Sequence, residues 1–465
     1  MDVAAGVAQD AVGNDNAAAT TFSVTNDTTA PVVTLGGPGA VFVNTFALSI
    51  SATEDITGLA EGDFVVTGGS VVAASLSGSG DSYIVQIEPV LGQTVDVTLP
   101  AGAVQDIAGN PTTAASAYSV QAGSPESEFE ANREAIIEIV QEDATRRLTN
   151  EMSANAEMIE RGLERFIDSF QNPDTATRDI PFDVTGRVGG TYGEHLSTNG
   201  TVFGQRNLDS GALRTAMGQF DVAVDEDNSW AAQISGRLTY EFSITDDTRL
   251  GYFFGGSLSR GEIAGAFNGD TRSISGIVGG YGLTRLQENL FASGYVGVGY
   301  ARTDLSFSNT TLALSGDYGA FSYYGGASLT GSIANPSGVE FRPQLAFDYG
   351  QTDIGVVGLQ ASAFGLTSPV STDYGAVSIL DMTVATEFIF PIDMQAGFAS
   401  LSFEPQLICR RATGSVDEES CGGGLGLGLE GKTENGNTRY GIEVDVTEVS
   451  GIRQSAARLF FEAEF

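Results

Sequence analysis

The chain ends on the stretch Ile452–Phe465, which reads IRQSAARLFFEAEF. Side chains of a β-strand point alternately to its two faces. One face of this stretch is apolar and consists of Ala457, Leu459, Phe461, Ala463 and Phe465. The opposite face is mostly charged or small and consists of Ala456, Arg458, Phe460, Glu462 and Glu464. The pattern predicts a final strand between an apolar and a polar environment, and such a strand needs further strands beside it.

The same alternation recurs upstream in long segments. They are about twice as long as the ~5–6 residues of a typical soluble strand, and they match tilted strands that cross a membrane. Together with the last stretch they predict an antiparallel transmembrane β-barrel of twelve strands, at residues 213–224, 230–243, 248–258, 272–285, 290–304, 317–333, 339–352, 376–390, 398–411, 421–430, 438–449 and 452–465.

Alternation also assigns the two faces of this predicted barrel. In Trp230–Phe242, for example, Ile234, Leu238 and Tyr240 share the apolar face, and polar residues occupy the other. The same reasoning in the other segments predicts a set of charged side chains that face the lumen: Arg237, Glu241, Arg342, Asp348, Glu404, Glu443, Asp445 and Arg458.

Connections between the segments alternate in length. Short ones with turn-forming residues contain Thr245–Asp247, Gln287–Asn289, Asn335–Gly338, Pro391–Ala396 and Gly431–Asn437. Longer ones contain Ser259–Thr271, Leu305–Asp317 and Asp353–Gly375. A barrel with short turns at one membrane surface and longer loops at the other requires this alternation.

Residues 180–212 precede these twelve segments. Phe182–Val188 and Thr201–Arg206 predict a short hairpin or antechamber around a polar loop that contains His195. A single histidine in a polar loop is expected to be solvated, so we assign it no catalytic role.

A long helix is expected before the barrel, over residues 124–172. Ser124 and Pro125 suit a helix start, an apolar stripe at 3- and 4-residue steps follows, and Asn172-Pro173 suits its end. Two placements are compatible with this helix: a trimeric coiled-coil stalk, or a linker inside the barrel lumen. In the second placement, Arg146, Arg147, Arg161 and Arg165 could meet acidic residues of the pore.

The helix, the barrel and the terminal aromatic residue together resemble the translocator domain of autotransporters, the proteins of type V secretion. The resemblance implies a location in the outer membrane, in contact with its lipid. It also implies that Phe461, Ala463 and Phe465 form a membrane-insertion signal read by the barrel-assembly machinery.

An internal repeat characterises the N-terminal region. Ala5–Val24 (AGVAQDAVGNDNAAATTFSV) aligns without a gap to Ala101–Val120 (AGAVQDIAGNPTTAASAYSV). The complete copy, residues 28–122, contains seven short β-rich runs separated by turn residues, as in an Ig-like β-sandwich. Its segments DTTAPVVTL and LPAGAVQDIAGN resemble bacterial Ig-like repeats. Residues 1–27 read as the tail of a truncated repeat, so we expect further modules and a signal peptide upstream.

Oxygen-bearing side chains in the loops of this repeat suit two interpretations. Asp27, Asp106 and Asn110 could bind Ca²⁺ and stiffen a string of modules. Alternatively, Asp106, Gly109 and Asn110 form a turn in which the polar side chains satisfy backbone groups. Calcium is the only cofactor that the sequence suggests.

Cys409 and Cys421 are the two cysteines, and they flank the acidic segment Arg410–Ser420. In an exported protein, two cysteines at this spacing predict a disulfide that closes an external loop. Two free thiols are the alternative.

Bulk composition argues against two classes of protein, those that bind nucleic acid and those that span a membrane with helices. The chain carries 59 acidic and 22 basic residues, a net charge of −37, which argues against nucleic-acid binding. It contains no apolar run of the ~18 residues or more expected of a transmembrane helix.

The sequence therefore predicts an outer-membrane anchor that displays an Ig-like passenger with an adhesive or stalk role toward an unknown extracellular ligand. An outer-membrane channel is the alternative. No catalytic set is recognisable, and Asn155 and Asn172 are the only candidates for self-cleavage in the helix.

Overall fold

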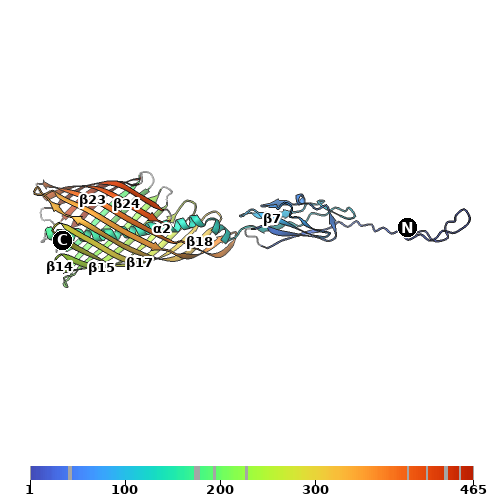
Figure 1. The fold of residues 1–465 in the computed structure, drawn as a ribbon, viewed down its shortest axis with the longest axis horizontal. Coiled ribbons are helices and arrows are strands. Elements are labelled where there is room, and N and C mark those ends of the chain that lie inside the picture. The colour runs from blue at the N-terminus through green and yellow to red at the C-terminus, as the bar shows by residue number, and fades with distance from the viewer. Residues whose placement is uncertain are drawn as a thin grey trace. The chain divides into compact units, whose positions relative to one another are not determined.

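The computed structural model describes residues 2–39, 44–171, 179–191, 195–225, 229–394, 397–414, 417–433, 438–449 and 452–463. The chain divides into two compact units, Met1–Ser127 and Glu128–Phe465. Figure 1 shows a β-sandwich in the first unit and a closed barrel with an internal helix in the second.

The first unit is an antiparallel β-sandwich. Its larger sheet runs β1-β2-β7-β5 with β6 on β7, its smaller sheet runs β10-β8-β4, and β3 pairs with β9. Alternate apolar residues of both sheets, such as Leu48, Val85 and Val97, are fully buried between them. The elements are β1 (Val33–Gly36), β2 (Phe46–Ala52), β3 (Ile56–Thr57), the 3₁₀ turn η1 (Glu61–Asp63), β4 (Val65–Thr67), β5 (Gly69–Val71), β6 (Ser77–Ser79), β7 (Ser82–Pro89), β8 (Thr94–Thr98), β9 (Gln105–Asp106) and β10 (Tyr118–Gln121).

The two copies of the sequence repeat adopt the same turn. Asn14 donates from its side chain to Asp10 (2.9 Å), and Asn110 donates in the same way to Asp106 (2.8 Å). The repeat thus encodes a local structure that forms in the isolated tail as well as in the complete sandwich.

The barrel of the second unit has 14 strands, not the twelve predicted. Its first strand pairs with its last over Phe182–Thr191 and Gln454–Ala463, which closes the sheet. The wall strands are β11 (Ile180–Thr191), β12 (His195–Asn207), β13 (Leu213–Asp225), β14 (Trp230–Thr245), β15 (Thr248–Ile263), β16 (Asn268–Gln287), β17 (Leu290–Ser308), β18 (Ala313–Gly331), β20 (Glu340–Asp353), β23 (Ala376–Met394), β24 (Gly397–Thr413), β25 (Glu418–Lys432), β26 (Thr438–Val449) and β27 (Ile452–Ala463), with the short β19 (Ile333–Ala334) beside β20.

The count was wrong because β11 and β12 carry a weak hydrophobic signal. Their outward positions include Gly186, Gly190, Gly200 and Gly204, and a strand with glycine on its outer face lacks the apolar alternation by which the other strands are recognised. The predicted hairpin around His195 is therefore the first pair of wall strands.

One side of the wall continues past the rest as a curved sheet. The predicted loop Asp353–Gly375 contains a hairpin, β21 (Val356–Ala363) and β22 (Leu366–Asp373), which pairs with the start of β18. Phe364 and Gly365 form its turn, both with positive φ (54° and 75°), as a two-residue hairpin requires. We call β21, β22 and the adjoining ends of β16–β18 the extension.

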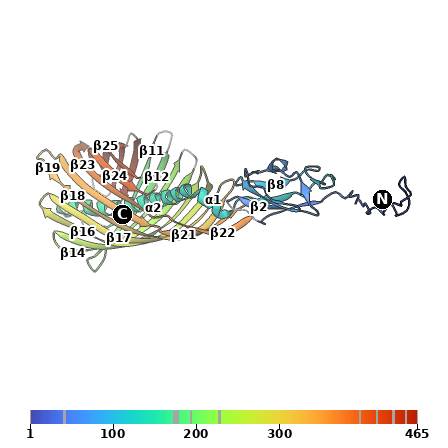
Figure 2. The ribbon, with the colours of Figure 1, turned by 45° about the vertical axis from the view of Figure 1, so that its right-hand side comes forward.

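Two helices precede the barrel strands: α1 (Pro125–Ala131) and α2 (Arg133–Gln171). Figure 2 shows α2 running through the inside of the barrel. Its apolar stripe, including Ile136, Leu148 and Phe166, is fully buried in one cluster with inward-facing residues of the wall and the extension. The lumen placement is thus the one observed.

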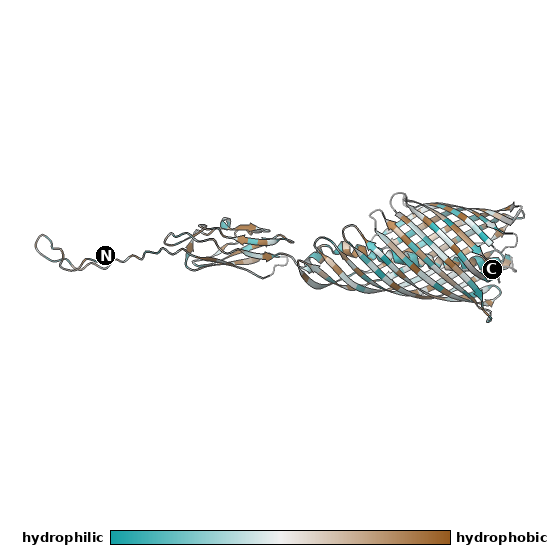
Figure 3. Cartoon of the chain, turned by 180° about the vertical axis from the view of Figure 1, so that it is seen from behind, coloured by the Kyte–Doolittle hydropathy of each residue, from teal (hydrophilic) through white to brown (hydrophobic). Residues whose placement is uncertain are grey.

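An exposed apolar belt surrounds the barrel. Residues of opposite polarity alternate along its strands (Figure 3), and outward side chains such as Leu258, Ile274 and Phe321 are about 60% exposed (61%, 60% and 58%). Beyond this belt, the outer face of the extension becomes charged, with Arg302 paired to Asp317 (2.9 Å). Within the described ranges, neither helix has the length and apolar character to span a membrane.

Candidate functional site

The N-terminal half of α2 is bound to the wall through Arg147. Its guanidinium donates to Ser273 (2.9 Å), Thr303 (2.6 Å) and the Tyr318 hydroxyl (2.7 Å) on three successive strands. Asp143, one turn earlier, pairs with Arg147 (3.1 Å) and accepts from Thr271 (3.1 Å). Burial of this arginine is therefore compensated by one charge and several hydroxyls.

The middle of α2 carries a second, fully buried anchor. Arg237 of β14 forms an ion pair with Glu151 and donates from Nε to the Asn155 side-chain oxygen (3.1 Å). Glu151 also accepts from Ser275 (3.2 Å) and Gln233 (3.4 Å). The side chains of Arg237 and Glu151 are only 0% and 6% exposed, so each depends on the other for charge compensation.

Two further arginines bind the C-terminal half of the helix to the wall. Arg161 donates to Asp183 of β11 (2.5 Å) and to Thr185 (2.9 Å). Arg165 pairs with Glu241 of β14 (3.3 Å) and donates to Gln205 (2.6 Å). The sequence suggested that arginines of the helix could meet acidic residues of the lumen. Arg161 with Asp183 and Arg165 with Glu241 are two such pairs.

The C-terminal end of α2 is fixed by aromatic and polar contacts. Phe166 and Phe170 pack on Phe291 with ring centroids 6.1 and 5.8 Å apart. Gln171 donates to Ser332 (2.5 Å) and Glu340 (3.2 Å), at the short connection before β20. The helix therefore runs from the extension to the opposite end of the barrel.

All eight charged residues predicted to face the lumen lie on inward positions. Arg237 and Glu241 contact α2 directly, as described above. The others interact mainly with wall residues: Arg342 with Glu340 (2.7 Å), Asp348 with Tyr295 (2.8 Å), Asp445 with Arg187 (2.5 Å) and Glu443 with Arg458 (3.2 Å), while Glu404 lies in electrostatic contact with Glu443 and Glu164.

The last strand takes the position that closes the barrel. In β27, Leu459 and Phe461 point outward and are 61% and 47% exposed. Ala463 lies at the end of β27, in register with Phe182 and Thr438. Phe465, the remaining residue of the expected insertion signal, lies outside the described residues.

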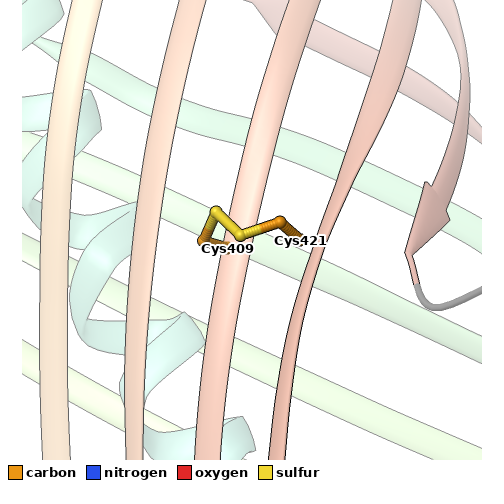
Figure 4. The surroundings of a disulfide bond; sticks show 2 residues. All are labelled: Cys409 and Cys421. Atoms are coloured by element: carbon orange, nitrogen blue, oxygen red, sulfur yellow. A yellow bond between two sulfur atoms is a disulfide. The ribbon is translucent and has the colours of Figure 1, made fainter.

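Cys409 and Cys421 form a disulfide between β24 and β25 (Figure 4). The two residues are direct partners in the antiparallel register, so the bond joins adjacent strands of the wall. The segment between them was expected to be a loop, but strand pairing extends to Ala412 and Glu418. The disulfide therefore closes a hairpin near the rim of the wall.

Three carboxylates of the sandwich converge on one point. Oxygen atoms of Asp27, Glu54 and Asp106 lie within 4.8 Å of one another. Asn110, the third residue of the predicted calcium set, donates its amide to Asp106 (2.8 Å) and to the Asp27 carbonyl (3.2 Å), while Glu54 was not in that set. The turn thus forms, and it also brings together oxygen atoms of the kind that Ca²⁺ prefers.

Charge in this cluster is only partly compensated. Burial and the Asp27 and Asp106 carboxylates raise the pKa of Glu54 above its usual value. Burial also acts to raise the pKa of Asp106, but hydrogen bonds from Asn110 and Gly109 outweigh it and hold that pKa below the usual value. A bound cation would relieve the repulsion that Glu54 experiences.

Sequence reasoning missed the acidic and neutral partners on the helix. Asp143, Glu151 and Asn155 are buried on α2, whereas only its arginines were expected to reach the wall. Inward polar residues such as Thr303 and Gln205 also went unassigned. The available signal was the occurrence of Asp and Glu within the buried stripe of the helix.

Comparison with protein families identifies both units. The family model described as autotransporter beta-domain matches residues 237–399. The chain therefore carries an autotransporter β-domain. A second model, described as bacterial Ig-like domain, matches residues 27–122. Both resemblances seen in the sequence are confirmed, and the autotransporter β-domain places the chain in the outer membrane.

Comparison with solved structures finds two autotransporter domains and one channel among its matches. The β domain of the Bordetella autotransporter Brka is 10% identical with a TM-score of 0.38, covering 62% of this chain and 100% of that one. The translocator domain of the autotransporter NalP from Neisseria meningitidis is 11% identical (TM-score 0.37; 68% and 98% covered). The CymD monoaromatic hydrocarbon channel is 10% identical (TM-score 0.42; 64% and 93% covered). Comparison with curated proteins finds no match.

Proposed function

We propose that the autotransporter β-domain anchors the chain in the outer membrane and holds the Ig-like domain at the cell surface, where it acts as an adhesive or stalk module. The direction of α2 carries this proposal. The N-terminal part of the helix packs on the extension, and Gln171 at its C-terminal end contacts Glu340 beside a short turn.

Outer-membrane barrels have short periplasmic turns and longer external segments. By this rule the extension faces outward, because its strands β16, β17 and β18 are the longest of the barrel together with β23. The helix then enters the lumen from outside. The Ig-like residues precede the helix in the chain, so they are external.

The anchors of the helix favour a passenger that stays attached. Asn155, the described candidate for self-cleavage, is fully buried, and its side-chain oxygen accepts from Arg237. This contact restrains the asparagine within a helix whose backbone is hydrogen-bonded. We therefore assign no enzymatic activity to the chain.

Partners follow from the surfaces and from the family. The exposed apolar belt contacts outer-membrane lipid, and β27 is the segment that the barrel-assembly machinery would recognise. The Ig-like domain would present the site for an extracellular ligand that is not a nucleic acid, since the net charge of the chain is −37.

Epitope tags on intact cells test the orientation. A tag inserted after Gly92, an exposed turn residue of the sandwich, should react with antibody on intact cells. A matched tag between Asp246 and Asp247, in the short turn after β14, should react only after the outer membrane is opened. Labelling in the reverse order would refute surface display.

A further inference from the structure

Three arginines lie on the outer face of neighbouring strands, where the apolar belt ends on the side of the extension. On each of β15, β16 and β17, the last large apolar or aromatic residue of the outer face is followed, two positions nearer that end, by an arginine. The pairs are Leu258 with Arg260, Ile274 with Arg272, and Tyr300 with Arg302. We call Arg260, Arg272 and Arg302 the arginine row, and its members are the first charges beyond the belt on these strands.

The arginine row lies at the level of lipid headgroups. On β15 the outward apolar residues begin with Leu250 (49% exposed), near the short turn after β14, and Arg260 follows ten residues later. Ten residues of strand at about 3.4 Å each, tilted by about 40°, rise about 26 Å. The apolar band of outer-membrane barrels is about 25 Å tall. The Arg260 guanidinium also lies over the ring of Trp230 (5.9 Å to its centroid), and tryptophan is typical of the membrane surface.

Two members of the row are direct cross-strand neighbours. Arg260 and Arg272 are partners in the register of β15 and β16, and both are exposed on the outer face. Like charges directly opposite each other destabilise a sheet. On β24 and β25, by contrast, Arg411 is opposite Glu419. An anion bound between Arg260 and Arg272 would relieve their repulsion.

The other charges on this face leave the arginine row able to bind such an anion. Arg272 pairs with Asp270 (3.3 Å; 63% and 41% exposed), and Arg302 pairs with Asp317 (2.9 Å; 63% and 50% exposed). Exposed pairs of this kind contribute little to stability, so they are readily exchanged for another anion. Within the described ranges, Arg260 has no ion pair.

Acidic residues on the same strands lie farther from the belt than the arginines. Two positions beyond each arginine, the outward residue is acidic: Glu262 on β15, Asp270 on β16 and Asp304 on β17. A ligand held against the apolar belt therefore meets the guanidinium groups before the carboxylates.

We propose that the arginine row binds the phosphate groups of lipopolysaccharide, the glycolipid of the outer leaflet, while the acyl chains lie on the belt at Leu258 and Ile274. The proposal rests on the proposed orientation, in which the extension faces outward. A guanidinium matches a phosphate with two parallel hydrogen bonds, and clustered basic residues beside a lipid-contact surface attract anionic headgroups. The row is continuous with the belt, so one lipid can satisfy both.

Native mass spectrometry of the purified full chain tests this inference, with heat-modifiable gel migration as the check of barrel assembly. The probe is lipid A, the phosphate-bearing anchor of lipopolysaccharide, and the same lipid A without its phosphates. The wild type should bind the phosphorylated form more tightly. Arg260→Gln/Arg272→Gln should weaken that binding roughly tenfold, because each basic residue near a lipid surface adds to the attraction. Binding of the dephosphorylated form should not change.

Arg206→Gln/Arg214→Gln is the matched control. These arginines are also direct partners on the outer face, near the opposite end of the barrel. Their outward neighbours toward the belt are Gly204 and Ala216, themselves partners in the register, which offer little apolar surface for acyl chains. The control variant should therefore bind phosphorylated lipid A as the wild type does.

Three results would overturn the proposal. They are unchanged binding of phosphorylated lipid A by Arg260→Gln/Arg272→Gln, an equal loss in the control variant, and wild-type binding of phosphatidylglycerol as tight as that of lipid A. The measurement uses purified protein and does not depend on orientation, whereas the epitope tags do not depend on lipid binding. Failure of lipid recognition and failure of surface display are therefore distinguishable.

Discussion

Replacement of Arg237 by methionine tests whether the buried ion pair holds α2 in the lumen. The variant leaves the Glu151 carboxylate, 6% exposed, without its countercharge. Removing one partner of a buried pair costs about 3–5 kcal/mol. Glu151 keeps hydrogen bonds from Ser275 and Gln233, each worth about 1 kcal/mol, which favours the lower end of that range.

A loss of about 3 kcal/mol corresponds to a change of about 150-fold in the opening equilibrium of the helix. Hydrogen exchange of α2 peptides in the assembled barrel measures it directly, because amides of a docked helix exchange through local opening. Urea unfolding followed by Trp230, the single tryptophan of the chain, reports on the whole barrel.

The double variant Glu151→Leu/Arg237→Met supplies the control. It removes both charges and should recover at least half of the lost protection, since no uncompensated charge remains buried. Unchanged exchange in Arg237→Met, or a double variant as unstable as the single one, would show that the pair does not hold the helix.

Three further predictions concern other parts of the chain. The disulfide spans 12 residues of sequence, so Cys409→Ser/Cys421→Ser should lower barrel stability to urea by about 3 kcal/mol by the chain-entropy relation; alkylation of the unreduced wild type at two thiols would contradict the bond. In calcium-free buffer, the pKa of Glu54 is raised, so the stability that this residue contributes to the sandwich is lost as pH rises through that pKa. The pKa of Asp106 is lowered, so the stability that Asp106 contributes is lost as pH falls through its folded value. Calorimetry of the full chain should therefore show that Glu54→Gln raises the unfolding temperature of the sandwich at pH 7, and that Ca²⁺ stabilises the wild type more than this variant; equal stabilisation would exclude the cluster as a calcium site. Intact-mass measurement should find both the wild type and Asn155→Ala as uncleaved chains, and a cleaved wild type beside an uncleaved variant would establish self-cleavage.

Local sequence patterns were enough to predict twelve of the strands, a turn of the sandwich and the long helix. Alternation alone located the twelve strands from Leu213 onward, because each has a lipid-facing side that must be apolar. The repeat predicted the Asp106–Asn110 turn, since its hydrogen bonds join residues close in sequence. The apolar stripe of α2 likewise needed only helical periodicity.

Tertiary structure decided what depends on partners distant in the chain. Strands β11 and β12 belong to the wall because β27 pairs with β11. Their sequence does not reveal this, since glycines such as Gly186 and Gly200 occupy outward positions where other strands carry apolar side chains. The anchor of Glu151 on Arg237 joins residues 86 positions apart, and Glu54 joins Asp106 only through the folding of the sandwich. The position of the helix follows from anchors such as Glu151 on Arg237: periodicity shows that a face is buried, but only the closed barrel determines which residues of the wall bury it.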